Sequence, residues 1–284
     1  MRSVALAGLV AALCVRVGLA QRALSPFTTY SYQLHDPLTG WHAPVTNARS
    51  NTLRLWMVGG LHGGVGAFVY AETQNTWGHS RGRFHVKQDW SGDSLSQNDE
   101  ASHLFFGYTL TRTFAAHWRW AGMTPRGSRK IGAFESAFVL TMVEALDAFN
   151  PAQGLGVSDL VFDYAGAGVG LWTLSHPGDG GIRTSIKVPA RARLFAENVR
   201  QSDNYIFWVT YRPPLGWGVK QPLSVGLGHS TRRAPDGVTP VREVHFGIGT
   251  TLPDVVRTFA PGAARYLGIL DFYYFNLNFT ATLK

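Results

Sequence analysis

The sequence predicts an α+β protein, with an N-terminal bundle of about four helices followed by a C-terminal antiparallel β layer. Up to His176, apolar and small residues recur with the 3.6-residue period of helices. Beyond it, short segments alternate apolar and polar residues with the two-residue period of strands. About 264 residues follow a predicted signal peptide at 1–20. That length suffices for a helical domain over 21–176 and a β-rich region over 177–284.

Residues 1–20 are typical of a secretory signal peptide. They begin with a positive charge, continue as the apolar run VALAGLVAALCV and end in small residues ahead of a predicted cut before Gln21. Arg16 interrupts the apolar run, which argues against a retained membrane anchor. Cleavage removes Cys14, the only cysteine, so no disulfide is expected, and Leu13 is too large for a lipoprotein signal. We therefore expect an exported protein of the periplasm or outer membrane of a Gram-negative-type bacterium.

The composition and charge indicate which kinds of partner the protein can bind. The formal charge of +8 falls to +6 once the two arginines of the leader are removed. A basic excess suits an anionic lipid or lipopolysaccharide surface. Nucleic acid is not expected, because the basic residues are scattered and the chain is predicted to be exported. With 13% aromatic and only 15% charged residues, the chain is apolar enough to predict association with a membrane surface.

The first helix is predicted over 52–77. Its several glycines each cost roughly 1 kcal/mol relative to alanine in a helix interior, so they need a structural reason. Two pairs have the spacing that lets helices approach closely, and we expect them to mark a packing face, with His62 as a core histidine. The pairs are Gly59 with Gly63 and Gly60 with Gly64.

The second and third helices carry recognisable start signals. The second is predicted over 98–122, with Asn98 or Ser96 as its N-cap and two acids in its first turn. The third starts at Thr124, as cap, and a first-turn proline, and runs to about Phe149. Its predicted inner face follows the 3.6-residue period and comprises Ala133, Ala137, Leu140 and Glu144.

The fourth helix is predicted to begin at Ser158, as its cap, with Asp159 in the first turn and Gly166 and Gly170 along one side. None of the four helices has about 18 uncharged apolar residues in a row, the usual signal of a membrane span. We therefore expect a compact helical bundle. Five strands are predicted after it, at 182–188, 204–211, 222–228, 242–249 and 275–283.

Three consecutive helices each carry a polar pair that shares one helix face. The spacing is three or four residues in each pair, which places the two side chains one turn apart. The pairs are Asp99 with His103, Glu144 with Asp147, and Asp159 with Asp163, and Ser158 lies beside the last.

The three pairs are expected to meet in space. In an antiparallel bundle, the helix from Asp99 and the helix from Ser158 start at the same end. The helix between them finishes there, which brings Glu144 and Asp147 to that end. Two helix N-termini also offer free backbone N–H groups and a positive dipole end, both of which stabilise carboxylates.

Such a cluster allows three interpretations. The acids could cap helix starts, with His103 as their charge partner. The cluster could bind a divalent metal, for which His103, Glu144 and Asp159 are the candidate ligands. It could also supply general acid–base chemistry, because like charges drive the pKa values of neighbouring acids apart.

The stretch from about 77 to 172 resembles a known family. The order of motifs is Asp-x-x-x-His, then EALDAF, then SDLVFD and a Gly-rich helix. It resembles the YfiM-like family of predicted periplasmic lipoproteins, a domain of unknown function, and is more distantly similar to VanZ-like membrane proteins. The resemblance implies that the acids and the histidine form one unit. Glu100 stands where that family usually has lysine, and Asp163 where it has asparagine; both add negative charge.

The sequence thus predicts a cell-envelope protein, non-enzymatic and membrane-associated, in which the acid–histidine cluster organises the helical domain. The alternative is an envelope enzyme or a metal- or ligand-binding protein that acts on a lipid or cell-wall component at that cluster.

Overall fold

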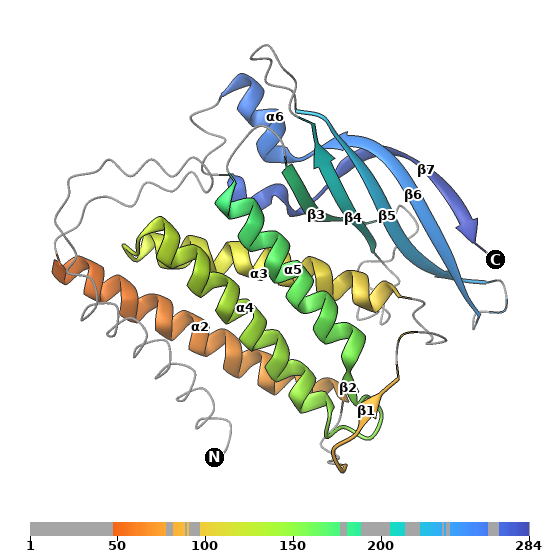
Figure 1. Cartoon of the computed structure of the whole chain (residues 1–284), viewed down its shortest axis with the longest axis horizontal. Coiled ribbons are helices and arrows are strands. Elements are labelled where there is room, and N and C mark those ends of the chain that lie inside the picture. Colours follow the sequence, from red (N-terminus) through yellow and green to blue (C-terminus); the bar gives the residue numbers. More distant parts are fainter. Residues whose placement is uncertain are drawn as a thin grey trace.

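A layer of helices carries a curved β-sheet at one side in the computed structural model of the chain (Figure 1). The structure describes residues 48–77, 82–88, 90, 97–176, 181–188, 205–213, 222–234, 236, 239–260 and 267–283. The helices are α2 (Ala48–Trp77), α3 (Asn98–Trp120), α4 (Pro125–Asp147), α5 (Val157–Ser175), α6 (Leu252–Phe259) and the 3-10 helix η3 (Gly268–Phe272). The four long helices, α2 to α5, precede the sheet in the chain, which confirms the α+β class.

Two of the predicted helix caps are wrong, and one is confirmed. The Thr124 side chain accepts a hydrogen bond from the backbone N–H of Gly127 at the start of α4, as predicted. The cap of α3 is Gln97, whose φ of 66° is left-handed, and Asn98 lies inside the first turn. The cap of α5 is Gly156, so Ser158 also lies inside the helix. Ser96 lies outside the described part of the chain. Asn98 and Ser158 are fully buried inside their helices. There they meet residues of other elements instead of capping a helix, as Ser158 does with Glu100.

Close contact between helices depends on glycines of α3, α4 and α5. A Cβ on Gly107 would lie 2.4 Å from the Asp163 carbonyl oxygen, and one on Gly132 would lie 2.6 Å from the Ala115 nitrogen. The contacts show that α5 runs parallel to α3 and that α4 runs antiparallel to it (Figure 1). The glycine pairs of α2 fit the packing hypothesis only in part, because Gly59 and Gly63 are buried but Gly60 and Gly64 have nothing within 4 Å of an added Cβ.

Helix α2 is held by an apolar contact and a buried polar group. Val58 packs with Phe114 and Trp118 of α3. His62, predicted to be a core histidine, lies 2.7 Å from Glu135 Oε1 through Nδ1 and 2.9 Å from His117 Nδ1 through Nε2. The Trp118 indole N–H donates to the other oxygen of Glu135 at 2.6 Å. A structural histidine therefore joins α2 to α3 and α4.

The five-stranded sheet is antiparallel throughout, in the order β3-β4-β5-β6-β7. The fully buried Trp208 lies on its inner face, and glycines of β5 and β6 make room for the indole ring. A Cβ on Gly228 would lie 2.9 Å from that ring. This close contact explains why glycine, which has a low β-propensity, occurs in these strands. The strands are β3 (Gly181–Lys187), β4 (Ile206–Arg212), β5 (Ser224–Arg233), β6 (Pro240–Thr250) and β7 (Phe275–Leu283).

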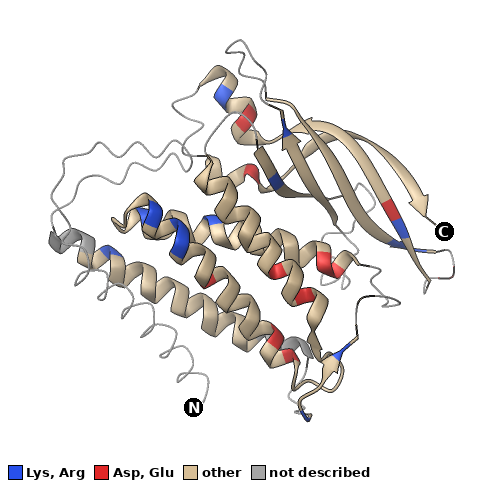
Figure 2. Ribbon diagram, in the orientation of Figure 1, with Lys and Arg blue, Asp and Glu red and all other residues tan. Residues whose placement is uncertain are grey.

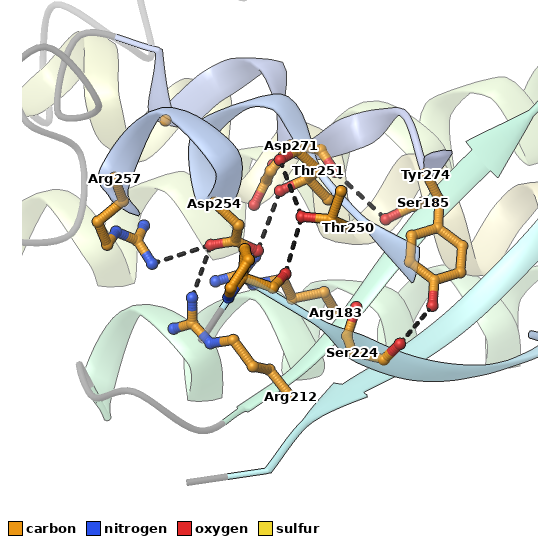
Figure 3. A network of polar contacts seen from close by, with 12 residues as sticks. Arg183, Ser185, Arg212, Ser224, Thr250, Thr251, Asp254, Arg257, Asp271 and Tyr274 are labelled. Atoms are coloured by element: carbon orange, nitrogen blue, oxygen red, sulfur yellow. Dashed lines mark hydrogen bonds and ion pairs between the residues drawn. The ribbon is translucent and has the colours of Figure 1, made fainter. Parts of the chain in front are cut away.

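The predicted strands match these five within a few residues, and the last matches to the residue. The 3-10 helix η3 and two further features were not predicted. The first is α6, which follows β6 directly and carries Asp254 into a buried group of arginines (Figure 3). The second is a short parallel pairing of β1 (Val86–Lys87) with β2 (Leu155–Gly156). Among the helices of the described residues, none is both long and apolar enough to cross a membrane.

Candidate functional site

The site lies where the N-terminal ends of α3 and α5 meet the C-terminal end of α4. Figure 2 shows acidic residues gathered at this end of the helical layer, and basic residues near the start of α4. The parallel α3 and α5 start side by side, and the antiparallel α4 finishes between them, as the sequence predicts. Four carboxylates and one imidazole thereby come within contact distance.

His103 is the centre of the group. Its Nδ1 lies 2.9 Å from Asp163 Oδ1, a hydrogen bond that orients the ring. Its Nε2 points between three carboxylate oxygens, at distances too long for hydrogen bonds. Those distances are 3.9 Å to Asp99 Oδ1, 3.9 Å to Glu144 Oε1 and 3.7 Å to Asp159 Oδ1.

Most of the side chains in the group are buried. The side chains of Glu144, Asp159 and Asp163 are 3%, 8% and 1% exposed, whereas those of His103 and Asp99 are 17% and 28% exposed. Burial of several carboxylates around one imidazole is costly unless a positive charge compensates for it. Solvent reaches the group at Asp99 and His103, which are its most exposed members.

Burial and mutual repulsion change the pKa values of the acids. Burial, with a smaller contribution from the charge of Asp159, raises the pKa of Glu144 to about 8, although His103 opposes the shift. The same causes raise the pKa of Asp147 to about 7. Burial alone would lower the pKa of His103, but the hydrogen bond and charge of Asp163, with the charges of Asp159 and Asp99, raise it to about 10. The group therefore holds excess negative charge and attracts protons or cations.

The remaining predicted residues lie in the surrounding layer. Ser158 donates a hydrogen bond to Glu100 Oε1 at 3.2 Å, and so joins α5 to α3. Asp147 lies further from His103 than the other acids but is within range of its charge. One buried oxygen of Asp147 and one of Asp163 have no hydrogen-bond partner among the described residues.

Sequence reasoning missed two contributors to the site. The backbone N–H of Gly156 donates to Glu144 Oε2 at 3.1 Å, which fixes that carboxylate and leaves Oε1 facing His103. Glu100 was noted as an acid of the first turn and as a departure from the family pattern. Its buried contact with Ser158 joins two helices, so no local spacing indicates it.

The stability of the metal-free protein should fall as the pH rises. The pKa of Glu144 rises from 4.5 to about 8 on folding, and that of Asp147 from 3.8 to about 7. Folding takes up protons at intermediate pH, so both groups destabilise the protein as pH rises through that interval. The stability that His103 contributes is fully present below 6.5 and is lost as pH rises through about 10. All three effects have the same sign.

Thermal unfolding in chelator-treated buffer should therefore have a midpoint several degrees lower at about pH 8 than at about pH 5.5. The Glu144→Gln variant cannot titrate at this position and should show a smaller difference. A midpoint that rises with pH in the wild type over this range would contradict the electrostatic description of the site.

No family model, curated protein or solved structure matches this chain. The resemblance to the YfiM-like family therefore stays a prediction, and the geometry of the site carries the functional argument.

Proposed function

We propose that the protein binds one divalent cation at the His103 site and that the cation joins α3, α4 and α5. The observation that carries the proposal is the position of His103 Nε2, which lies 3.7–3.9 Å from three carboxylate oxygens. Ligand atoms about 2.1 Å from a common ion lie about 3 to 4 Å apart, so these separations fit an ion between them.

The outer contacts of the site fit the same proposal. A histidine ligand usually donates its second ring N–H to a carboxylate, which fixes the ring and makes the other nitrogen a better ligand. Asp163 supplies that carboxylate to His103. The ligand atoms of Asp99, His103 and Asp159 lie within 4.8 Å of one another, as do those of His103, Glu144 and Asp163.

The donor set favours a first-row divalent ion. Carboxylate oxygens suit Mg²⁺, Ca²⁺ and Mn²⁺, whereas imidazole nitrogen favours Zn²⁺ and other transition ions. Each of the two groups of ligand atoms combines two carboxylates with one imidazole, which favours Mn²⁺ or Zn²⁺ over Ca²⁺ or Mg²⁺. Because the side chains of Glu144 and Asp159 are almost fully buried, we propose a structural role for the ion, in the cell envelope that the N-terminal sequence predicts.

Calorimetric titration of chelator-treated protein with MnCl₂ and with ZnCl₂ tests the proposal. We expect one saturable site per chain for at least one of these ions, with a rise in the unfolding midpoint. His103→Gln should remove that site. Asp163→Asn should lower the affinity by about 10- to 100-fold, because it weakens the support of the imidazole ligand.

His176→Gln is the matched control, because it removes an exposed histidine at the opposite end of α5. Its affinity should equal that of the wild type. Absence of saturable binding of either ion to the folded wild type, or binding that His176→Gln removes and His103→Gln leaves unchanged, would refute the proposal.

A further inference from the structure

The outward face of the five-stranded sheet is covered with large apolar side chains. Two rows cross the neighbouring strands β5, β6 and β7 in register. Their six members are between 47% and 88% exposed, and Leu277 and Phe279 are the most exposed of them. The first row is Leu227, Phe246 and Phe279, and the second is Val225, Ile248 and Leu277.

The inner face of the same strands is polar, which reverses the usual arrangement. Ser230 and His245 are almost fully buried and lie 2.9 Å apart, from Oγ to Nε2. The Nδ1 of His245 lies 2.9 Å from Thr280 Oγ1 on β7. An antiparallel sheet in water normally buries its apolar face and exposes its polar face. The reversed pattern indicates that an apolar medium contacts the outward side.

The outward face is convex, because the sheet curls around its polar side. The edge strands β3 and β7 approach each other through a bridge between Ile186 and Tyr273. The Lys187 ammonium also donates to Asn276 Oδ1 at 2.6 Å and to Asn278 Oδ1 at 2.9 Å. A second copy of the same convex face would touch it only along a narrow strip. Fluid acyl chains, by contrast, can follow a convex surface.

The accessible charge around this face is basic. Among the described residues from 181 to 283, all acids except Asp236 are at most 5% exposed, and arginines pair with them. By the alternation of the strands, Arg242 of β6 and Arg233 of β5 lie on the same side as the two rows, and Arg242 is exposed. Such charges complement the headgroups of anionic lipids.

We propose that the outward face of the sheet, defined by these two rows, inserts among the acyl chains of a membrane that contains anionic lipid. The interaction combines burial of apolar side chains with attraction between exposed arginines and lipid phosphates. It is independent of the cation site, which lies on the helices.

Flotation of the full chain with lipid vesicles tests the proposal. The wild type should float with phosphatidylcholine vesicles containing phosphatidylglycerol, and part of it should stay bound in high salt. The double variant Leu277→Asn/Phe279→Asn should reduce the partition coefficient at least tenfold, which is about what loss of two large apolar contacts predicts. Both side chains are almost fully exposed, so the fold should be retained, as circular dichroism can verify.

Phe259→Asn is the matched control. Phe259 is 83% exposed but lies on α6, away from the two rows, so its removal should leave flotation unchanged. Equal flotation of the double variant and the wild type would overturn the proposal, as would complete release by salt. The proposal also fails if the wild type does not float and instead forms a dimer that the double variant dissociates.

Discussion

Replacement of Asp254 by asparagine is expected to lower the free energy of unfolding by about 3–5 kcal/mol. Asp254 is 2% exposed and lies at the centre of the network in Figure 3. Its two oxygens accept hydrogen bonds from Arg183 and Arg212, both at 2.6 Å, and from Arg257 at 2.9 Å. Arg183 and Arg212 are themselves buried or nearly so, and loss of the carboxylate would leave their charges without compensation.

The same contacts predict how the variant responds to acid. Burial alone would raise the pKa of Asp254, but the three arginines outweigh it and lower the pKa below its usual value of 3.8. The stabilisation by Asp254 is therefore present above about pH 4 and is lost as the pH falls through the pKa of the folded protein. The asparagine variant should lack this part of acid unfolding.

Urea unfolding followed by tryptophan fluorescence measures both effects. Asp236→Asn is the control, because Asp236 is an exposed acid of the same β region, and its loss should cost less than about 1 kcal/mol. If the two variants were equally stable, the network around Asp254 would not hold α6 on the sheet.

Replacement of Gly166 by alanine should destabilise the protein by several kcal/mol, through the contact between α5 and α3. An added Cβ would lie 2.3 Å from the Leu104 carbonyl oxygen and 3.0 Å from the Tyr108 nitrogen. These are backbone atoms, so one helix must move away from the other. That movement would also separate Asp163 from His103, and the variant should therefore bind a divalent cation more weakly.

Gly168→Ala is the matched control on the same helix, because nothing lies within 4 Å of a Cβ at Gly168. There alanine should stabilise the protein by about 1 kcal/mol, the difference in helix propensity. Chemical denaturation of both variants, with calorimetric titration of the same samples, gives the comparison. Equal stability of the two variants would mean that the helices do not approach as closely as described.

The sequence by itself determined the class of fold and the membership of the acid–histidine cluster. Both follow from local periodicity. The change from a 3.6-residue to a two-residue period near His176 separates helices from strands, and the strand at 275–283 alternates so regularly that its bounds are exact. Spacings of three and four residues placed the paired acids on shared helix faces, and the alternating direction of the helices brought those faces to one end.

Features that depend on contacts between distant segments, such as helix caps and glycine contacts, were decided only by the tertiary structure. Asn98 and Ser158 have the side chains of helix caps, but they lie inside their helices because buried partners such as Glu100 are available to them. The glycine spacing of α2 is equal to that of α5, yet Gly60 and Gly64 have nothing within 4 Å of an added Cβ, whereas Gly166 and Gly170 meet α3 closely. Nothing local distinguishes the two cases.

The tertiary structure alone also decided which face of the sheet is turned inward. Alternation in the sequence shows that one face is apolar and the other polar, but it does not show which face is turned inward. The contact between the two edges of the sheet decides this, because it curls the strands around Trp208 and leaves Leu277 and Phe279 outside. The orientation of His103 is likewise a result of packing, since the hydrogen bond that its Nδ1 donates to Asp163 joins residues 60 positions apart in the chain.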